Sequence, residues 1–457
     1  MSKPLHFVAF VMNTASHITH GLWRDPAGDQ IRFDDLDLWV DLAKRLEAGG
    51  FDAIFFADVV GLYGDYRGSW DFHAELGLQI PSNDPLVILS ALASHTEHLG
   101  LAFTAAPIQE PPFNFARRVA TLDHASKGRI AWNIVTGALP NGAANFGQDL
   151  TAHDDRYAWA DEYLDVLYKL WEGSWDEGAL LRDRTSGVYA DPSKIHKIHH
   201  VSERYAVEGP FLVSPSPQRT PLLFQAGSSP VGRDFAARNA EAQFIISPDP
   251  DSARALIDDT RRLAVEHGRR RDDLKFFQGL SFVVGSTEEE ARRKEAELDE
   301  KIDVHGMIAH LGGGIGVDLG EYDADDPIDA DATDGVRSIV LWLKEANGGR
   351  TPTVRDISRF LAGRSRIVGT PEQIADELAA WQAAGVDGVN VINATIPGSY
   401  DEFIAHVLPV LRQRGLAADG YAEGTLRRKL FGADRLSERH PAARYRGAFA
   451  GEPVGTA

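Results

Sequence analysis

The stretch GRIAWNIVTGALPNGAANFGQDLTAHDDRYAWADEY, residues 128–163, decides the fold. Its apolar run 129–135 is rich in β-branched and aromatic residues, which predicts a buried strand. A loop of Gly, Asn and Pro follows, and we expect a helix to begin near His153. The strand brings Asn133 to the loop, while His153 and Tyr157 are four residues apart and share one helix face. Hydrogen-bonding groups therefore gather at one rim, which is where barrel enzymes keep their active sites.

The same strand-then-helix unit recurs along the chain. We expect eight apolar strands, at 5–12, 51–57, 99–104, 129–135, 222–226, 242–246, 274–284 and 388–393. Helical patterns lie between and after them, at 35–48, 85–97, 114–126, 153–171, 231–240, 250–267, 287–302, 371–384 and 400–414. This alternation predicts an α/β protein, a (β/α)8 TIM barrel that forms a single domain over residues 1–457.

Three segments fall outside the repeat. Two are insertions, an irregular polar one at 172–220 and a second at 303–367 that contains a run of glycines, and the third is a charged tail after residue 414. A doubly wound sheet is the alternative fold. It is disfavoured because no G-x-G-x-x-G motif follows any of the expected strands.

Composition excludes several classes of protein. The formal net charge of -20 repels nucleic acid and anionic membranes. Without cysteine there can be no disulfide, thiolate nucleophile or zinc-cysteine site. The chain contains neither a signal-peptide pattern nor an 18-residue apolar run, so we expect a cytoplasmic protein.

Polar residues stand at the ends of several expected strands. Asp58 ends the second strand, where barrels place catalytic and binding groups, although a turn or helix-capping role is the simpler alternative. Thr104, Asn133 and Thr136 end strands three and four. Uncharged donors and acceptors suit the edge of a planar heterocycle better than they suit a metal or acid-base chemistry.

The segment QAGSSP, residues 225–230, indicates a phosphate site. It joins the fifth strand to a helix, and its small residues let backbone N–H groups approach an anion. Gly227 and Ser229 are the candidates within it. Arg156 and Tyr157 could reach the same anion from the helix that begins near His153.

Histidines allow a different interpretation. His17 and His20 form H-x-x-H in a loop, whereas metal hydrolase barrels need two histidines one residue apart on a strand. This spacing argues against a metal site, and no metal site is expected. A metal-dependent barrel hydrolase is kept as the alternative from another class. His310 is either a lid residue over the site or a histidine near a helix end.

Long motifs resemble the bacterial luciferase-like flavin-dependent monooxygenases, in the branch of the nitrilotriacetate, dibenzothiophene-sulfone, dimethylsulfide and long-chain alkane monooxygenases. The motifs occur in the order of the family and span almost the full chain: GLWRDP (21–26), FFADVVGLYGDYRGS (55–69), QIPSNDPL (79–86), ARRVATLDHASKGRIAWNIVT (116–136), HDDRYAWADEYLDVLYKLWEGSW (153–175), SPSPQRTPLLFQAGSS (214–229), GTPEQIADEL (369–378) and HPAARYR (440–446).

The resemblance implies a barrel that holds FMN at its C-terminal mouth. It implies that the flavin arrives as FMNH2 from a separate NAD(P)H:flavin reductase and reacts with O2 to form a hydroperoxide that oxidises a small or medium organic substrate. The residues that match the family's flavin contacts are Asp58, Thr104, His153, Tyr157 and Ser229, with Asn133 and Gly227 as added neighbours.

The substrate pocket of the alkane enzymes maps onto six positions. His17, Tyr63, Gln79 and His310 match and are the candidate catalytic residues, whereas Thr14 replaces a cysteine and Ala138 replaces a histidine. The two departures argue against terminal alkane hydroxylation. The loop 59–84 and the insertion 303–367 are the candidate lids.

The resemblance leaves one alternative within the family and one expectation about assembly. A riboflavin lyase that cleaves riboflavin to lumichrome and a sugar belongs to the same group. Members of the family often form dimers or tetramers, so we expect a homodimer or homotetramer.

Overall fold

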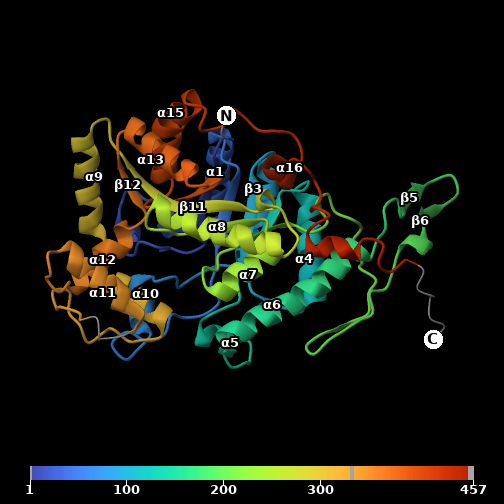
Figure 1. Ribbon diagram of the computed structural model, residues 1–457, viewed down its shortest axis with the longest axis horizontal. Helices are drawn as coiled ribbons and strands as arrows, with labels where there is room; N and C mark the ends of the chain where they lie inside the picture. The colour runs from blue at the N-terminus through green and yellow to red at the C-terminus, as the bar shows by residue number, and fades with distance from the viewer. Residues whose placement is uncertain (1–2, 330–333, 451–457) are drawn as a thin grey trace.

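The computed structural model describes residues 3–329 and 334–450, and it contains a closed barrel of eight parallel strands (Figure 1). Each strand pairs with the next one along the barrel, and pairing of β1 with β13 and of β10 with β11 completes the ring. The barrel strands are β1 (His6–Met12), β2 (Ala53–Ala57), β3 (Gly100–Ala105), β4 (Ile130–Ile134), β9 (Leu222–Gln225), β10 (Ala242–Ile245), β11 (Lys275–Val284) and β13 (Gly388–Ile392). The predicted TIM barrel is confirmed.

Helices connect the strands and surround the barrel. All nine predicted helical segments are present to within a few residues, as α1 (Leu36–Gly49), α3 (Pro85–His95), α4 (Pro112–Ala125), α6 (His153–Tyr168), α7 (Pro230–Asn239), α8 (Pro250–Glu266), α9 (Glu288–Lys301), α13 (Pro371–Ala383) and, in the last segment, α14 (Gly398–Glu402) and α15 (Leu408–Gln413). Many begin at residues that the sequence marks. Asp84, for example, accepts a hydrogen bond from the backbone of Leu86, and Pro85 follows in the first helical turn.

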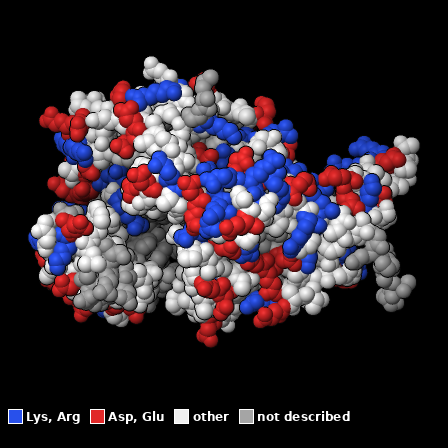
Figure 2. Space-filling model, in the orientation of Figure 1, with Lys and Arg blue, Asp and Glu red and all other residues white. Residues whose placement is uncertain are grey.

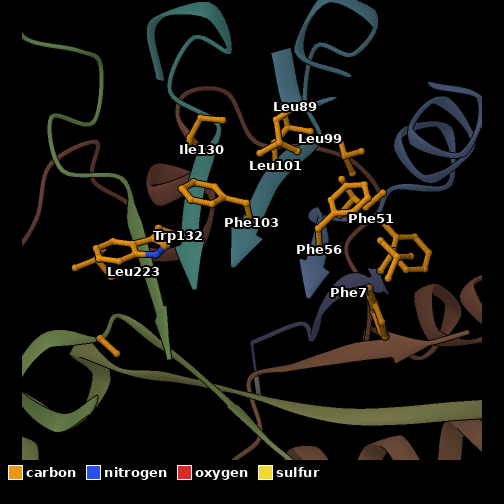
Figure 3. Packing of buried hydrophobic residues seen from close by; sticks show 14 of the residues in the cluster. Phe7, Phe51, Phe56, Leu89, Leu99, Leu101, Phe103, Ile130, Trp132 and Leu223 are labelled. Carbon is orange, nitrogen blue, oxygen red and sulfur yellow. The ribbon is translucent and has the colours of Figure 1, made fainter. Parts of the chain in front are cut away.

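The strands bury both faces. Side chains of alternate residues, such as Val8 and Phe10 of β1, fill the inside of the barrel, whereas Phe7 packs outward against the helices. Figure 3 shows part of this outer layer, in which aromatic and aliphatic residues of successive strands meet those of the helices. Burial on both faces explains why the strands appear in the sequence as continuous apolar runs.

The expected loops and the first insertion contain more regular structure than predicted. Short helices α2 (Asp71–Leu76) and α5 (Pro140–Asn145) interrupt the loops after β2 and β4. The insertion 172–220, expected to be irregular, contains two antiparallel hairpins, β5 (Leu180–Asp183) with β6 (Val188–Ala190) and β7 (His200–Val201) with β8 (Ala206–Val207). The hairpin of β5 and β6 projects from the body (Figure 1). Its strands are largely exposed, so they lack the apolar pattern that reveals a buried strand.

The second insertion is mainly helical. It contains α10 (Val304–Ile315), α11 (Asp334–Ala346) and α12 (Val354–Gly363), which form a lobe beside the barrel (Figure 1). It ends in a ninth strand, β12 (Arg366–Gly369), which pairs with residues 281–284 of β11 beyond the part of β11 that closes the barrel. The expected glycine run lies in the last turn of α10, and Gly316 ends that helix with a φ of 74°.

The charged tail after residue 414, where no helix was expected, packs against the barrel. It runs back under the barrel and forms α16 (Leu426–Phe431), whose Leu426 and Leu430 pack into the same cluster as the residues inside the barrel. Arg427 between them is 1% exposed and forms an ion pair with Glu241, with an Nε–Oε1 distance of 2.7 Å. The charges of this segment therefore include a buried ion pair.

The surface carries both signs of charge. Figure 2 shows acidic and basic side chains interspersed over one face, which also has a hollow between the lobe of the second insertion and the barrel. Within the described ranges, none of the helices has the length and apolarity needed to cross a membrane.

Candidate functional site

A cavity of about 350 Å³ lies at the C-terminal mouth of the barrel. Loops after β2, β3, β4 and β9 form its wall, together with the start of α6 and one residue of α10. Five of the predicted site residues line it: Asp58, Tyr63, Thr104, Tyr157 and Gly227. The rest of the wall is largely apolar, so the cavity resembles a site for a flat organic ligand.

Thr104 and Asn133 are hydrogen-bonded to each other on neighbouring strands of the barrel. They are partners in the register of β3 and β4. The amide of Asn133 donates to the Thr104 hydroxyl at 3.1 Å, and that hydroxyl donates to the carbonyl of Phe56 at 2.9 Å. The other amide atom, Asn133 Oδ1, is buried without a hydrogen-bond partner in the part of the chain that the structure describes. It is therefore a buried acceptor without a partner, beside Thr104, which lines the cavity.

Asp58 lies where the prediction put it, directly after β2. Burial, with a smaller contribution from the carboxylate of Asp84, raises the pKa of Asp58 from 3.8 to about 7. Burial and the proximity of Asp58 also raise the pKa of Tyr63 to about 12. The cavity thus contains a carboxyl group that can hold a proton near neutral pH and a phenol that stays protonated.

The turn after β9 forms a cradle around Gly227. A Cβ atom at this residue would lie 2.6 Å from the Tyr157 hydroxyl and 2.4 Å from Gln225 Nε2, so a larger residue would force these two side-chain ends to move. Ser229 caps α7 by accepting a hydrogen bond from the Gly232 backbone at 3.1 Å. Backbone N–H groups at a helix start next to a tight glycine turn are the usual setting for a phosphate.

Arg156 and His153 behave differently at the start of α6. Arg156 lines the cavity, and its Nη1 donates to the carbonyl of Thr151 at 2.7 Å. His153 is outside the cavity wall, with its side chain 50% exposed and hydrogen-bonded to Asp154 at 2.6 Å. Its ring meets the edge of Tyr157 with centroids 5.4 Å apart, so it supports that tyrosine from the solvent side.

A second cavity of about 710 Å³ adjoins the first and shares Asp58 and Thr104 with it. Gln79 lines this second cavity, and its Nε2 donates to the carbonyl of His17 at 2.8 Å. Gln79 has a φ of 54°, a left-handed conformation that is uncommon for glutamine. The loop containing Gln79 therefore lines the second cavity and also contacts the first barrel loop, which contains His17.

Only Tyr63 and Ala138 of the six pocket positions line the main cavity, and Thr14 and His17 make other contacts. The Thr14 hydroxyl donates to the carbonyl of Pro81 at 2.7 Å and holds two loops together. His17 is buried against Phe10, with ring centroids 4.7 Å apart, and it borders only a void of about 10 Å³. Ala138, in contrast, lines the main cavity, so the small residue at that position enlarges the site.

His310 lies within α10 and is not at its C-terminal end, which favours the lid interpretation. Its ring packs against Tyr63 with centroids 4.3 Å apart, and its Nδ1 lies 2.6 Å from His20 Nε2. Burial, and then the nearby His73, lower the pKa of His310 to about 4. Gly313 presses on the same loop, because a Cβ there would lie 1.9 Å from the Tyr63 carbonyl oxygen. The lobe of the second insertion thus contacts the cavity wall.

Three residues have contacts that the sequence did not predict. Gln225 lines the cavity and has a buried Oε1 without a partner among the described residues. Its place at the end of β9 could have revealed it. Gln243 donates to the carbonyl of Gly227 at 2.8 Å, and His20 contacts His310, but nothing in the local sequence indicates either contact.

A metal site is not apparent. Within residues 3–329 and 334–450, no group of three or more His, Asp or Glu side chains is arranged to hold a metal ion. His17 and His20 contact other protein groups, as described above.

The chain matches the luciferase-like monooxygenase family over residues 10–388. It is 44% identical over 459 residues to the dimethyl-sulfide monooxygenase of Hyphomicrobium sulfonivorans, covering 99% of this chain and 96% of that protein. It is also 44% identical over 450 residues to the long-chain alkane monooxygenase of Geobacillus thermodenitrificans, covering 98% of this chain and 99% of that protein.

A solved structure gives a further comparison. The crystal structure of a riboflavin lyase with modified FMN and its substrate riboflavin superimposes with a TM-score of 0.87 at 38% identity, over 97% of this chain and 100% of that one. These similarities extend over nearly the whole chain and decide against the metal-dependent hydrolase. The chain belongs to the luciferase-like monooxygenase family, and it is a monooxygenase.

Proposed function

We propose that this monooxygenase binds FMN in its reduced form, FMNH2, in the cavity at the barrel mouth. It uses O2 to transfer one oxygen atom to a small or medium organic molecule, and the second oxygen atom leaves as water. The observation that carries the proposal is the shape of the cavity. It joins an apolar wall with uncharged polar groups to a glycine cradle at a helix start.

The residues present fit FMN in two respects. Buried acceptors without partners in the described structure, Asn133 Oδ1 and Gln225 Oε1, suit the N–H groups of a flavin ring. At the other end, the Gly227 cradle, the start of α7 and Arg156 suit a phosphate. Tyr157 joins the two ends, since its hydroxyl borders the cradle and its ring lines the cavity.

When bound, FMNH2 would supply the two electrons that split O2. The protein's part is to orient the ring, to exclude water and to hold protons. The apolar wall keeps water out of the reaction space. Asp58 and Tyr63 hold protons at carboxyl and phenol oxygens that line the cavity, and His310 contacts Tyr63 from the lid. Gln79 and His17 brace the neighbouring loop rather than line the main cavity.

The proposed substrate is neutral and largely apolar. Apart from Asp58 and Arg156, the wall of the cavity carries no charged side chain in the described residues, and Ala138 leaves space beside it. An anionic or strongly polar substrate would leave polar groups unpaired against such a wall. A sulfide or alkane matches this chemistry, and the two similar enzymes named above are a dimethyl-sulfide and a long-chain alkane monooxygenase.

Oxygen uptake tests the proposal. Purified protein receives FMN, NADH and a separate flavin reductase, and oxygen consumption and product are measured with dimethyl sulfide, hexadecane, nitrilotriacetate and riboflavin. We expect product from a neutral substrate only when reductase, NADH and oxygen are all present. Product formed without oxygen, or no anaerobic binding of FMNH2, would contradict the proposed function.

A riboflavin lyase is the second candidate, and the solved lyase structure favours it specifically. In that case the second cavity, which shares Asp58 and Thr104 with the first, would receive riboflavin beside the bound flavin. Loss of riboflavin and appearance of lumichrome in air, but not under nitrogen, would decide for the lyase.

The remaining expectations concern partners and location. A separate NAD(P)H:flavin reductase would supply FMNH2, and because its reductant is cytoplasmic we place the pair in the cytoplasm. A homodimer or homotetramer is supported by exposed apolar residues of the first insertion, such as Tyr189 at 68% and Val201 at 83% exposure. Light scattering on the purified chain measures the assembly directly.

A further inference from the structure

A buried chain of hydrogen bonds leads from the first barrel loop to the lid helix. Ser16 Oγ lies 2.5 Å from His20 Nδ1, and His20 Nε2 lies 2.6 Å from His310 Nδ1. The His20 ring is completely buried, and Ser16 is 3% exposed. Residues 290 positions apart in sequence are thus joined through two imidazole rings.

The direction of the protons in this chain follows from hydrogen-bond satisfaction. The Ser16 hydroxyl makes no other hydrogen bond within the described residues, so it must donate to His20 Nδ1 or leave a buried O–H without an acceptor. Burial, reinforced by His310, keeps the pKa of His20 well below 6.5, so its ring is neutral and carries its single proton on Nε2. His20 then donates to Nδ1 of His310, and the proton of the neutral His310 ring must lie on Nε2.

His310 does not itself line the cavity, but it lies on the face of α10 that borders the cavity. His310 and Gly314 are one helical turn apart and share a face, and Gly314 lines the cavity. Tyr63, which also lines the cavity, packs on the His310 ring. Nε2 of His310 has no hydrogen-bond partner in the residues that the structure describes, and it is not among the fully buried polar atoms.

We propose that His20 is a positioning residue that locks His310 in the Nε2–H tautomer, so that His310 presents a hydrogen-bond donor to the ligand in the cavity. The assignment of the donor to that ligand rests on the proposed function. The tautomer itself does not, because Ser16, His20 and His310 determine it within the protein.

The side chain and the backbone of His20 have separable roles. The backbone carbonyl accepts from Asp303 N at 2.9 Å, and the backbone N–H contacts Met307 Sδ at 3.4 Å, so the backbone of His20 docks the start of α10. The side chain acts on His310 alone within α10. Substitution of the side chain therefore tests the tautomer while the docking contacts of the helix remain.

The direct test is the ¹⁵N spectrum of the full chain labelled at histidine, with His310→Gln to assign the His310 signals. We expect a protonated Nε2 and an unprotonated Nδ1 for His310 at pH 7. In His20→Leu the two tautomers should become mixed. In His20→Gln, whose amide occupies the place of Nε2, a single tautomer should persist. A wild-type His310 protonated on Nδ1, or a tautomer unchanged by His20→Leu, would overturn the proposal.

Turnover adds a second measurement. With FMNH2, oxygen and dimethyl sulfide, we expect His20→Leu to lower kcat about 10-fold, as loss of an oriented donor should. FMNH2 affinity should stay within about twofold, and His20→Gln should recover most of the rate. Equal loss of rate in both variants would assign His20 a purely structural role and overturn the proposal. If the wild-type chain neither binds FMNH2 nor consumes oxygen, the proposed function fails, while the spectrum still decides the tautomer.

Discussion

The side-chain amide of Asn133 donates a hydrogen bond of 3.1 Å to the hydroxyl of Thr104 on the neighbouring strand. Because the hydroxyl donates its own hydrogen bond to the carbonyl of Phe56, it accepts from the amide, which gives the amide a fixed orientation and leaves its oxygen without a partner in the described residues. The pair therefore orients a buried acceptor beside Thr104, which lines the cavity, with two uncharged side chains.

Thr104→Val should weaken FMN binding. Valine has nearly the same shape but cannot accept from Asn133, so the amide is free to rotate and the Phe56 carbonyl loses its donor. We expect about a tenfold loss of FMN affinity, measured by fluorescence titration. Thr121→Val, on the exposed side of α4, is the matched control and should change nothing. An unchanged affinity for FMN in Thr104→Val would mean that the Asn133 oxygen does not contact the flavin.

Gly227→Ala should abolish discrimination between FMN and riboflavin, which lacks the phosphate. The new methyl group would meet the Tyr157 hydroxyl and Gln225 Nε2, and it would fill the cradle. We expect the wild-type chain to prefer FMN by at least about tenfold, since charge-assisted hydrogen bonds hold a phosphate. Titration with both ligands measures the preference. Gly363→Ala, where a Cβ meets nothing within 4 Å, is the control. If Gly227→Ala still prefers FMN over riboflavin, the phosphate does not bind at the Gly227 cradle.

Asp58→Asn should stabilise the protein at high pH relative to low pH. The pKa of Asp58 is about 7 in the fold against 3.8 ordinarily. Between these values the folded chain keeps a proton that the unfolded chain has released, so the free energy of unfolding falls as the pH rises. Asparagine stays neutral and avoids this loss.

Urea unfolding at pH 4.5 and pH 8 measures the effect. The gain from Asp58→Asn should be about 3 kcal/mol larger at pH 8. Asp251→Asn, at a side chain that is 89% exposed, should show no such dependence. A gain that is the same at both pH values would mean that Asp58 is ionised throughout.

Arg427→Met should destabilise the barrel. The guanidinium pairs with both oxygens of Glu241, at 2.7 and 2.9 Å, and also donates to the carbonyls of Thr220 and Pro221. Its removal leaves a buried carboxylate without its partner, which costs about 3–5 kcal/mol. Chemical denaturation measures the loss. Arg428→Met, at the next residue, breaks an exposed pair with Asp434 and should cost under about 1 kcal/mol. Equal losses of stability in the two variants would contradict the stabilising role of the buried pair between Arg427 and Glu241.

The barrel could be predicted because its strands are buried on both faces. Continuous apolar runs such as residues 129–135 indicate such strands directly, and caps such as Asp84 mark the helices. The hairpins of the first insertion could not be predicted, since exposed strands lack that signal. The packing of the segment around Arg427 was not predicted because a buried ion pair and a solvated charge look the same in sequence.

Site residues that directly follow barrel strands could be predicted from the sequence. Contacts between residues that are far apart in the sequence could not. Asp58, Thr104 and Gly227 follow three different strands, and the closed barrel brings them to one cavity. The family pattern suggested that Thr14 and His17 would face the same pocket, but the fold turns them to other contacts. The contact of His20 with His310 could not be predicted because His310 is supplied by an insertion.

Strand β11 pairs with three strands, β10, β13 and β12. Its first residues complete the ring with β10, and its last four pair with β12 at the end of the second insertion. The segment between Gly285 and Ser365, which contains α9 and most of the second insertion, therefore leaves β11 at one end and returns to it at the other, and no barrel strand is cut if it is exchanged for that of a relative. Chimaeras joined at those two residues would exchange α9 and the cover that carries His310 while every barrel strand stays unchanged.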